Sequence, residues 1–294
     1  MRLALPLALL LAGCTAPVKP HASGGAPLRI VSTNPCADAM LVELVSPDRI
    51  AAISHYSQDP AATSMPLEVA NRFASTTGTA EEVIALDPDL VLTSSFTPAS
   101  TRNAYERAGL RTLLLDSPTT IEASKAQIVQ VAAAVGEEAR GRALNIKIDR
   151  ALASALLRRR PGPSIGPVVT GPWPTRGKGK ENPSALLFIA GSLASGSGNL
   201  LDELLTRAGF RNAAADYGLA FTGNVPIETI AAHPPRVILT PGPSRTAALR
   251  ARVLAATHAG TTEAAFPRTL VNCGGPTIIP AITRLAAIRR QLAS

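Results

Sequence analysis

The sequence has 294 residues, a length typical of about two domains. Hydrophobic residues make up 46% of it, which excludes a globally disordered chain, and aromatic residues make up only 3%, which excludes a site built mainly of aromatic rings. The formal net charge of +8 favours an anionic partner. We expect no nucleic-acid partner, because the sequence has neither a zinc-finger spacing nor basic stretches interleaved with aromatic residues.

The N-terminal segment has the form of an export signal. Arg2 supplies a positive start, an apolar stretch follows, and residues 11–14 read Leu-Ala-Gly-Cys. The apolar stretch is too short to cross a membrane as a helix. Its ending resembles a bacterial lipobox and predicts a signal peptide over residues 1–14 with lipid on Cys14, although an ordinary secretory signal with a chance cysteine would look similar. Residues 15–27 are predicted to form a flexible tether.

One sequence pattern occurs twice, over residues 81–93 and 228–240. Each copy begins with Glu, has Pro seven positions later, continues with apolar residues and ends with Thr. Glutamate suits the first turn of a helix because of the helix dipole, and proline cannot continue a helix. Each copy therefore predicts a short helix followed by a buried parallel strand, and the repetition predicts two similar lobes.

Strands and helices alternate through both halves of the chain, which is typical of an α/β fold with parallel sheets flanked by helices. We assign residues 28–136 to an N-terminal lobe and residues 185–294 to a C-terminal lobe. Besides those of the repeat, the expected strands lie at residues 29–32, 50–54, 110–116, 185–190 and 269–272. The expected helices lie at residues 37–44, 100–108, 120–135, 200–208, 247–256 and 278–292.

A long helix is expected between the lobes, at residues 137–160. Leu144, Ile148 and Leu152 recur there at helical spacing, so the segment would form either a rigid connector or a surface helix of the first lobe. Residues 161–184, rich in Pro, Gly and basic side chains, predict a long loop. That loop would be a solvated insertion, or it would contact anionic lipid headgroups.

Together these features resemble the periplasmic-binding-protein family, and within it the class that serves ABC importers of ferric siderophores, haem and cobalamin. The resemblance covers about residues 28–294 apart from residues 161–184, and residues 78–93 are its most specific part. It implies two lobes joined by one rigid helix, a ligand cleft between them and little lobe motion. It also implies a monomeric, non-enzymatic carrier without a resident cofactor, whose ligand is a metal chelate.

The resemblance further implies that Glu81 and Glu228 dock onto arginine residues of the dimeric ABC permease, one from each lobe. Both glutamates begin equivalent helices, so they would present two similar anionic groups to a two-fold symmetric partner. The alternative is that both merely stabilise the start of a helix.

Candidate cleft residues follow from the position of ligands in open α/β sheets, which bind outside the carboxyl ends of the strands. By the resemblance, Tyr56 matches a position that packs on the ligand in cobalamin-binding relatives. A tyrosine at a strand end is also often part of the core, and a single histidine is often structural. The candidates from both lobes are Asn34, Cys36, His55, Tyr56, Asp59, Thr76, Phe96, Ser195, Asn224 and Cys273.

Cys36 and Cys273 each follow a predicted strand, one in each lobe. An oxidising compartment permits a disulfide, but the two Cα atoms would have to lie within about 7 Å. A wide cleft for a large chelate would hold the two residues further apart. We therefore expect two free or ligand-facing thiols, with a disulfide as the alternative.

Two other functions remain open on the sequence alone. An enzyme would fit a two-lobed α/β frame, although the chain has no Gly-x-Ser-x-Gly, Cys-x-x-Cys or His-Glu-x-x-His motif. A binder of a bare transition metal would need clustered ligands. The histidines expected in the folded region are His55, His233 and His258, and no two of them are close in sequence.

Overall fold

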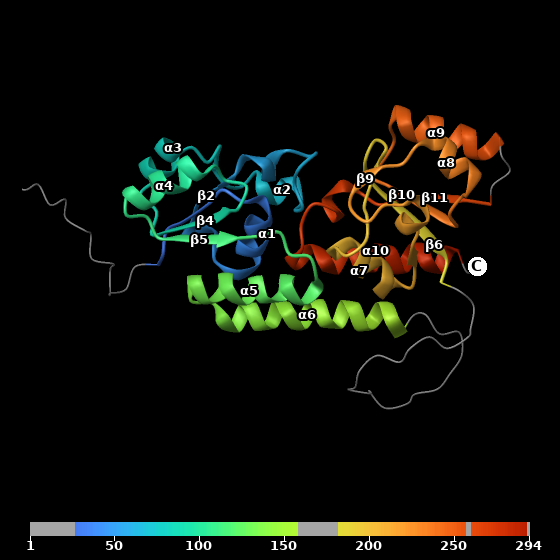
Figure 1. The fold of residues 1–294 in the computed structure, drawn as a ribbon. Coiled ribbons are helices and arrows are strands. Elements are labelled where there is room, and N and C mark those ends of the chain that lie inside the picture. The colour runs from blue at the N-terminus through green and yellow to red at the C-terminus, as the bar shows by residue number, and fades with distance from the viewer. Residues whose placement is uncertain (1–26, 158–181, 257–259, 293–294) are drawn as a thin grey trace, which may run out of the picture.

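The computed structural model describes residues 27–157, 182–256 and 260–292. These residues form two α/β lobes side by side, with two long helices along their base (Figure 1). The predicted signal peptide, the lipidation site Cys14 and most of the predicted basic loop lie outside the described residues. Within the described ranges, no helix combines the length and the hydrophobicity needed to span a bilayer.

The N-terminal lobe is built on a five-stranded parallel sheet in the order β3-β2-β1-β4-β5. Its strands are β1 (Ile30–Ser32), β2 (Ile50–Ser54), β3 (Ser75–Thr76), β4 (Leu90–Ser94) and β5 (Thr112–Leu115). Its α-helices are α1 (Pro35–Leu44), α2 (Leu67–Ala70), α3 (Ala80–Ala85), α4 (Ala99–Arg107) and α5 (Ile121–Val135). Two 3-10 turns lie beside β2, namely η1 (Pro47–Arg49) and η2 (His55–Gln58).

The C-terminal lobe has a six-stranded sheet in the order β11-β10-β6-β7-β9, with β8 paired to β6. The pairs formed by β11, β10, β6 and β8 are parallel, whereas β7 and β9 are antiparallel additions. The strands are β6 (Ser184–Ala190), β7 (Leu193–Ala194), β8 (Arg211–Asn212), β9 (Gly223–Asn224), β10 (Val237–Thr240) and β11 (Thr262–Ala265). The helices are α7 (Leu200–Ala208), α8 (Ile227–Ala232), α9 (Arg245–Ala256) and α10 (Ile278–Gln291), with 3-10 turns η3 (Ala214–Tyr217), η4 (Arg268–Leu270) and η5 (Gly275–Thr277).

The predicted two-lobed α/β fold is confirmed, and the two repeat units form α3–β4 and α8–β10. The strand predicted at residues 269–272 is wrong. The last parallel strand is β11, and residues 268–270 form the 3-10 turn η4 instead. Pro267 follows the final ladder hydrogen bond, from the Phe266 amide to the Thr240 carbonyl, and proline has no N–H with which to extend the ladder.

The connecting helix α6 (Glu138–Leu157) runs along the base of the molecule (Figure 1). Its inward face carries Leu144, Ile148, Leu152 and Ala155, all buried, at the spacing seen in the sequence. The helix packs against α5 of the N-terminal lobe and against α10 of the C-terminal lobe. It is therefore the connector that the first of the two sequence interpretations predicted.

A single hydrophobic core extends beneath both sheets. It includes Ile128 of α5, Ile148 of α6, Leu204 of α7 and Ile282 of α10, each buried. On their opposite faces the sheets have separate, smaller cores, one under α3 and α4 and the other under α8 and α9. Pulling the lobes apart at their base would expose the shared core to water, which opposes a wide opening.

Strands β1 and β4 show why the central strands are apolar without alternation. Ile30 of β1 and Leu92 of β4 belong to the shared core, whereas their neighbours Val31 and Val91 pack in the smaller core on the other face. Successive side chains of a strand point to opposite faces, so both faces of this sheet are covered.

A disulfide bond joins the two lobes. Cys36 lies in the first turn of α1 and Cys273 just before η5, and their Cα atoms are 5.3 Å apart although 237 positions separate them in sequence. The expectation of two free or ligand-facing thiols is therefore wrong. It assumed that strand-end residues of different lobes stay apart, but α1 and the segment leading into α10 meet where the lobes join.

Hydrogen bonds reinforce the lobe junction beside the disulfide. The Asn272 amide donates to the Ala62 carbonyl at 2.9 Å, and the Gly275 N–H donates to the Ser124 hydroxyl at 2.5 Å. A Cβ atom at Gly274 would lie 2.4 Å from the Ser124 hydroxyl oxygen, so this close approach requires glycine. We call the disulfide and these two hydrogen bonds the interlobe clasp.

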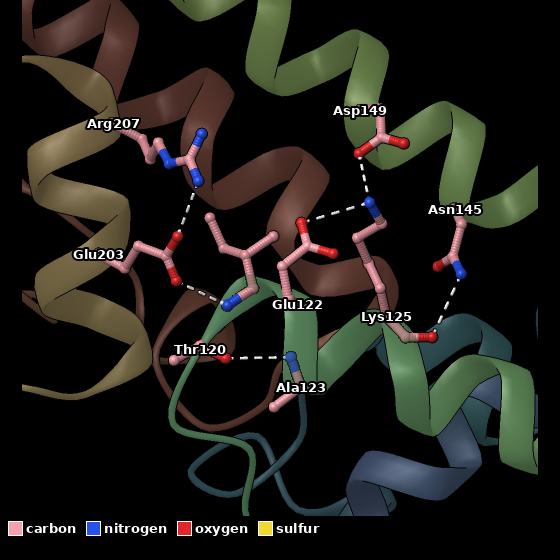
Figure 2. A network of polar contacts seen from close by, with 9 residues as sticks. Thr120, Glu122, Ala123, Lys125, Asn145, Asp149, Glu203 and Arg207 are labelled. Atoms are coloured by element: carbon pink, nitrogen blue, oxygen red, sulfur yellow. Dashed lines mark hydrogen bonds and ion pairs between the residues drawn. The ribbon is translucent and has the colours of Figure 1, made fainter. Parts of the chain in front are cut away.

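Figure 2 shows another polar junction, at the start of α5. Glu203 of α7 accepts the Ile121 N–H at 2.7 Å and pairs with Arg207 at 3.0 Å. One turn further along α5, Lys125 pairs with Asp149 of α6 at 2.8 Å. A carboxylate at a helix N-terminus is electrostatically favourable, so Glu203 ties the C-terminal lobe to the N-terminal lobe.

Candidate ligand-binding cleft

A cleft of about 1140 Å³ lies between the lobes and is lined by both of them. Most of its buried lining residues are apolar, namely Ala37, Met40, Leu115, Leu200, Cys273 and Gly274, whereas Asn34 and Ser195 are the buried polar ones. Residues of the clasp therefore line the cleft as well as joining the lobes.

The walls of the cleft carry mostly neutral polar groups. Asp116 and Arg268 are the two charged side chains among the described lining residues, so the net charge of the chain is not concentrated here. Arg268 donates to the Ile189 carbonyl at 3.4 Å and to the Ala61 carbonyl at 3.5 Å, which holds it across the lobe boundary. Besides His55 and Tyr56, the other polar lining residues are Thr33, Asn34, Thr77, Ser94, Thr97, Ser117, Gln127, Ser195, Asn199, Thr222 and Asn272.

Exposed aromatic rings lie at the rim. Tyr56 is 51% exposed and Phe96 is 81% exposed, and both line the cleft. Phe221, 83% exposed, directly precedes the lining residue Thr222. These three are the most exposed aromatic side chains in the described part of the chain, and they come from both lobes. Such rings are suited to contact a large, partly apolar ligand.

The structure brings together seven of the ten predicted cleft residues and leaves out three. The three that do not line it make hydrogen bonds elsewhere. Thr76 is buried and donates to the Glu82 carboxylate, Asp59 accepts from the Ala61 N–H, and Asn224 accepts from the Ser192 hydroxyl. The seven that line the cleft are Asn34, Cys36, His55, Tyr56, Phe96, Ser195 and Cys273.

The sequence reasoning missed other cleft residues. Asp116 directly follows β5, so it could have been selected as a residue at the carboxyl end of a strand. Asn272 was missed because residues 269–272 were assigned to a strand, and Arg268 because it directly precedes that strand; the structure has the turn η4 there instead.

Buried Asp38 anchors the turn that carries His55 and Tyr56. Its Oδ2 accepts the Ser54 N–H at 2.9 Å and the Ser57 hydroxyl at 2.6 Å, while its Oδ1 has no hydrogen-bond partner among the described residues. The side chain is 0% exposed, and this burial raises the pKa of Asp38 to about 7. Burial therefore favours the protonated form of this carboxyl.

Glu81 and Glu228 lie in the first turns of α3 and α8, and both are exposed. The two helices occupy the side of their lobes that faces away from α6 (Figure 1). Neighbouring Glu82 is engaged instead: hydrogen bonds from Thr76 and then Thr77 lower the pKa of its carboxyl. The Glu81 carboxylate has no such partner among the described residues.

Each of these helices is held by a tyrosine. The Tyr105 hydroxyl donates to the Gly78 carbonyl before α3 at 2.8 Å, and the Tyr217 hydroxyl donates to the His233 carbonyl after α8 at 2.6 Å. Desolvation raises the pKa of both tyrosines to about 12, so they remain donors at physiological pH.

The sequence matches the family model described as "Periplasmic binding protein" over residues 30–265. The chain therefore belongs to the periplasmic binding protein family, a family of binding proteins that work outside the cytoplasm. Among curated proteins, no relative matches the sequence.

Solved structures share its fold. The periplasmic heme-binding protein BhuT, in complex with two hemes, is 22% identical with a TM-score of 0.70, and the match covers 92% of this chain and 100% of BhuT. The heme-binding protein RhuT from Roseiflexus sp. RS-1 is 24% identical with a TM-score of 0.68 and the same coverage, 92% and 100%. The vitamin B12 binding protein BtuF of Vibrio cholerae is 16% identical with a TM-score of 0.65, covering 91% of this chain and 99% of BtuF.

The raised pKa of Asp38 predicts a pH-dependent stability. The unfolded chain ionises this carboxyl near its ordinary pKa of 3.8, whereas the folded protein does so only near 7. The buried, protonated Asp38 therefore stabilises the folded protein at low pH, and this stabilisation is lost as pH rises from about 4 to about 7. Its upper limit is on the order of 4 kcal/mol. Asp38→Asn resembles the protonated form and should gain stability relative to the native chain over that range. Denaturant unfolding at pH 4, 5.5 and 7.5 measures the difference.

Asp48→Asn is the matched control, because Asp48 is an exposed carboxylate in the turn before β2. It should leave the pH dependence unchanged. A stability difference between Asp38→Asn and the native chain that stays constant with pH would contradict the raised pKa.

Proposed function

We propose that this protein is the substrate-binding lipoprotein of an ABC importer, which captures a metal chelate in the interlobe cleft and delivers it to the permease. The chelate would be a ferric siderophore, cobalamin or haem. The protein would act as a monomer without a resident cofactor and would be held at the membrane by lipid on Cys14.

The observation that carries this proposal is the cleft itself. It offers about 1140 Å³ between two lobes that are held together at their base, and both lobes contribute to its lining. An apolar base, neutral hydrogen-bonding walls and exposed aromatic rings at the rim match a large organic ligand better than a bare ion. The heme-binding and vitamin B12 binding proteins of the same fold add support from their ligands.

A binder of a bare transition metal is the second candidate, and the cleft favours it less. In the described part of the chain, no three His, Cys, Asp or Glu side chains come together as metal ligands would. A metal held here would have to bring most of its ligands with it. Another small organic ligand, or an enzymatic reaction in the cleft, would appear in the binding experiment as failure of the chelates to bind.

Calorimetric titration of soluble protein beginning after Cys14 tests the cargo. The panel is cobalamin, haem and several ferric siderophores, with free Fe³⁺ and Zn²⁺ as comparisons. We expect one class of chelate to bind saturably with a Kd of roughly micromolar or tighter, and the bare ions to bind weakly. Binding of a bare ion alone, or of no member of the panel, would contradict the proposal.

Charge reversal tests whether Glu81 and Glu228 dock onto the permease. Glu81→Lys combined with Glu228→Lys should lower chelate uptake by at least about tenfold, because both anionic contacts with the permease would become repulsive. Affinity for the chelate should stay within about twofold, since neither residue lines the cleft. Uptake into cells and calorimetry on the purified variant provide the two readouts.

The control reverses two exposed acidic residues at the base of the molecule, Asp48→Lys and Glu138→Lys. This variant should transport normally. Normal uptake by the Glu81 and Glu228 variant, or an equal loss in the control, would show that docking does not depend on these glutamates.

A further inference from the structure

The disulfide of the interlobe clasp also lies in the wall of the cleft. Cys36 and Cys273 both line the cleft, Cys36 half-buried and Cys273 8% exposed. A disulfide that only stabilises a fold does not need such a position, because its effect on the unfolded chain depends on the length of the loop that it closes. A thiol that attacks a disulfide needs access to a sulfur atom, and the cleft gives that access at Cys36.

The start of α1 favours Cys36 as a thiolate that leaves during exchange. Cys36 is the second residue of this ten-residue helix, and its N–H donates to the Asn34 side chain at 2.9 Å. The helix dipole stabilises a thiolate at a helix N-terminus, and a thiol that ionises readily leaves faster. Once protonated, a Cys36 thiol has an acceptor in place, because the Asn272 carbonyl oxygen lies 3.7 Å from its Sγ.

The lobes stay joined when the disulfide is broken. The shared core runs beneath both lobes, and the Ile121 N–H still donates to Glu203 of the opposite lobe. Reduction therefore removes one constraint without separating the lobes. The constraint that is lost lies at the cleft, where α1 and the segment before η5 both carry lining residues.

We propose that the Cys36–Cys273 bond is a thiol–disulfide exchange site, through which an extracytoplasmic dithiol lowers the affinity of the cleft. The inference rests on the proposed function, since the affinity concerned is that for the chelate. One thiolate of the dithiol attacks Cys36 Sγ, and Cys273 leaves as a thiolate and takes up a proton. The second thiolate then attacks the mixed disulfide, and Cys36 leaves and is protonated. The dithiol is oxidised by two electrons to its own disulfide, and the protein bond is reduced by the same two electrons.

Ligand and reductant oppose each other at this site. A chelate that fills the cleft covers Cys36, so the loaded protein should resist reduction. The reduced cleft is less preorganised, so a ligand that enters it loses more conformational entropy. The two effects are one coupling, because a ligand that prefers the oxidised protein must also favour the disulfide over the two thiols.

Thiol release from the full chain carrying Cys14→Ser tests the site, because Cys36 and Cys273 are then its only cysteines. We expect dithiothreitol to release both thiols without denaturant, while circular dichroism shows that the chain is still folded. Ferrichrome, cyanocobalamin or ferric haem, whichever binds, should slow this release by at least about fivefold. Reduced thioredoxin at the same concentration is the comparison, and the faster of the two reagents identifies a small dithiol or a dithiol protein as the reductant.

Calorimetry with the same three chelates tests the effect on affinity. The Cys36→Ser and Cys273→Ser double variant, measured without reductant, should bind at least about fivefold more weakly than the oxidised protein. The native chain, reduced and then freed of dithiothreitol under nitrogen, should match the variant and replaces it if the variant does not fold. The variant is also the control for the reagent, since the same treatment should leave its affinity unchanged.

The outcomes separate the inference from the carrier function. Thiols that appear only when denaturant unfolds the chain would overturn the exchange site. Equal affinity in the oxidised, reduced and double-variant proteins would overturn the control of affinity and leave the carrier function intact. Failure of all three chelates to bind the oxidised protein would overturn the proposed function, and the coupling to cargo with it.

Discussion

The bond between Cys36 and Cys273 is the constraint on which the geometry of this molecule most depends. It joins the start of α1 to the segment that leads into α10, so it connects the two lobes at the bottom of the cleft. With 237 positions between the cysteines, the chain-entropy model assigns it on the order of 5 kcal/mol of stabilisation through the unfolded state. Its larger consequence is local, because the cleft cannot widen at its base while the bond is intact.

The shared core and the two hydrogen bonds of the interlobe clasp hold the lobes together in the same way as the disulfide. Hydrophobic side chains from α5, α6, α7 and α10 form one core beneath both lobes, and Glu203 caps α5 from the opposite lobe (Figure 2). A cleft held in this way is preorganised, so little conformational entropy is lost when a ligand enters. The same rigidity favours a ligand whose shape matches the cleft.

Within this fixed frame, selectivity depends on a small number of side chains. The mostly apolar base and the neutral walls suit the organic ligand proposed above, while Asp38 holds the turn that carries His55 and Tyr56. The glutamates proposed to dock onto the permease lie elsewhere, on α3 and α8, so the proposed docking surface is separate from the cleft.

Local patterns in the sequence predicted most of the frame. The two Glu-to-Thr repeats and the apolar positions of α6 depend on neighbouring residues, and the structure has the elements that they predict. The disulfide was predicted wrongly because the distance between Cys36 and Cys273 is set by how the lobes pack, which no local pattern contains. Residues 269–272 were predicted as a strand, but residues 268–270 form a turn, and the apolar residues Leu270 and Val271 pack against the shared core. Thr76 was predicted to line the cleft because it lies at the carboxyl end of a strand, but its side chain donates a hydrogen bond to Glu82 instead.

The central claim, that the two lobes form one body with a cleft of fixed width, is tested most directly by measuring the distance between them. Spin labels introduced through unnatural amino acids at Ser100 of α4 and Arg252 of α9, both exposed, leave the native cysteines untouched. Pulsed electron resonance on the oxidised protein should give one narrow distance distribution that ferric haem or cobalamin does not shift. The Cys36→Ser and Cys273→Ser double variant should give a broader distribution. A broad distribution in the oxidised protein, or a shift of several ångströms when ligand binds, would contradict the claim.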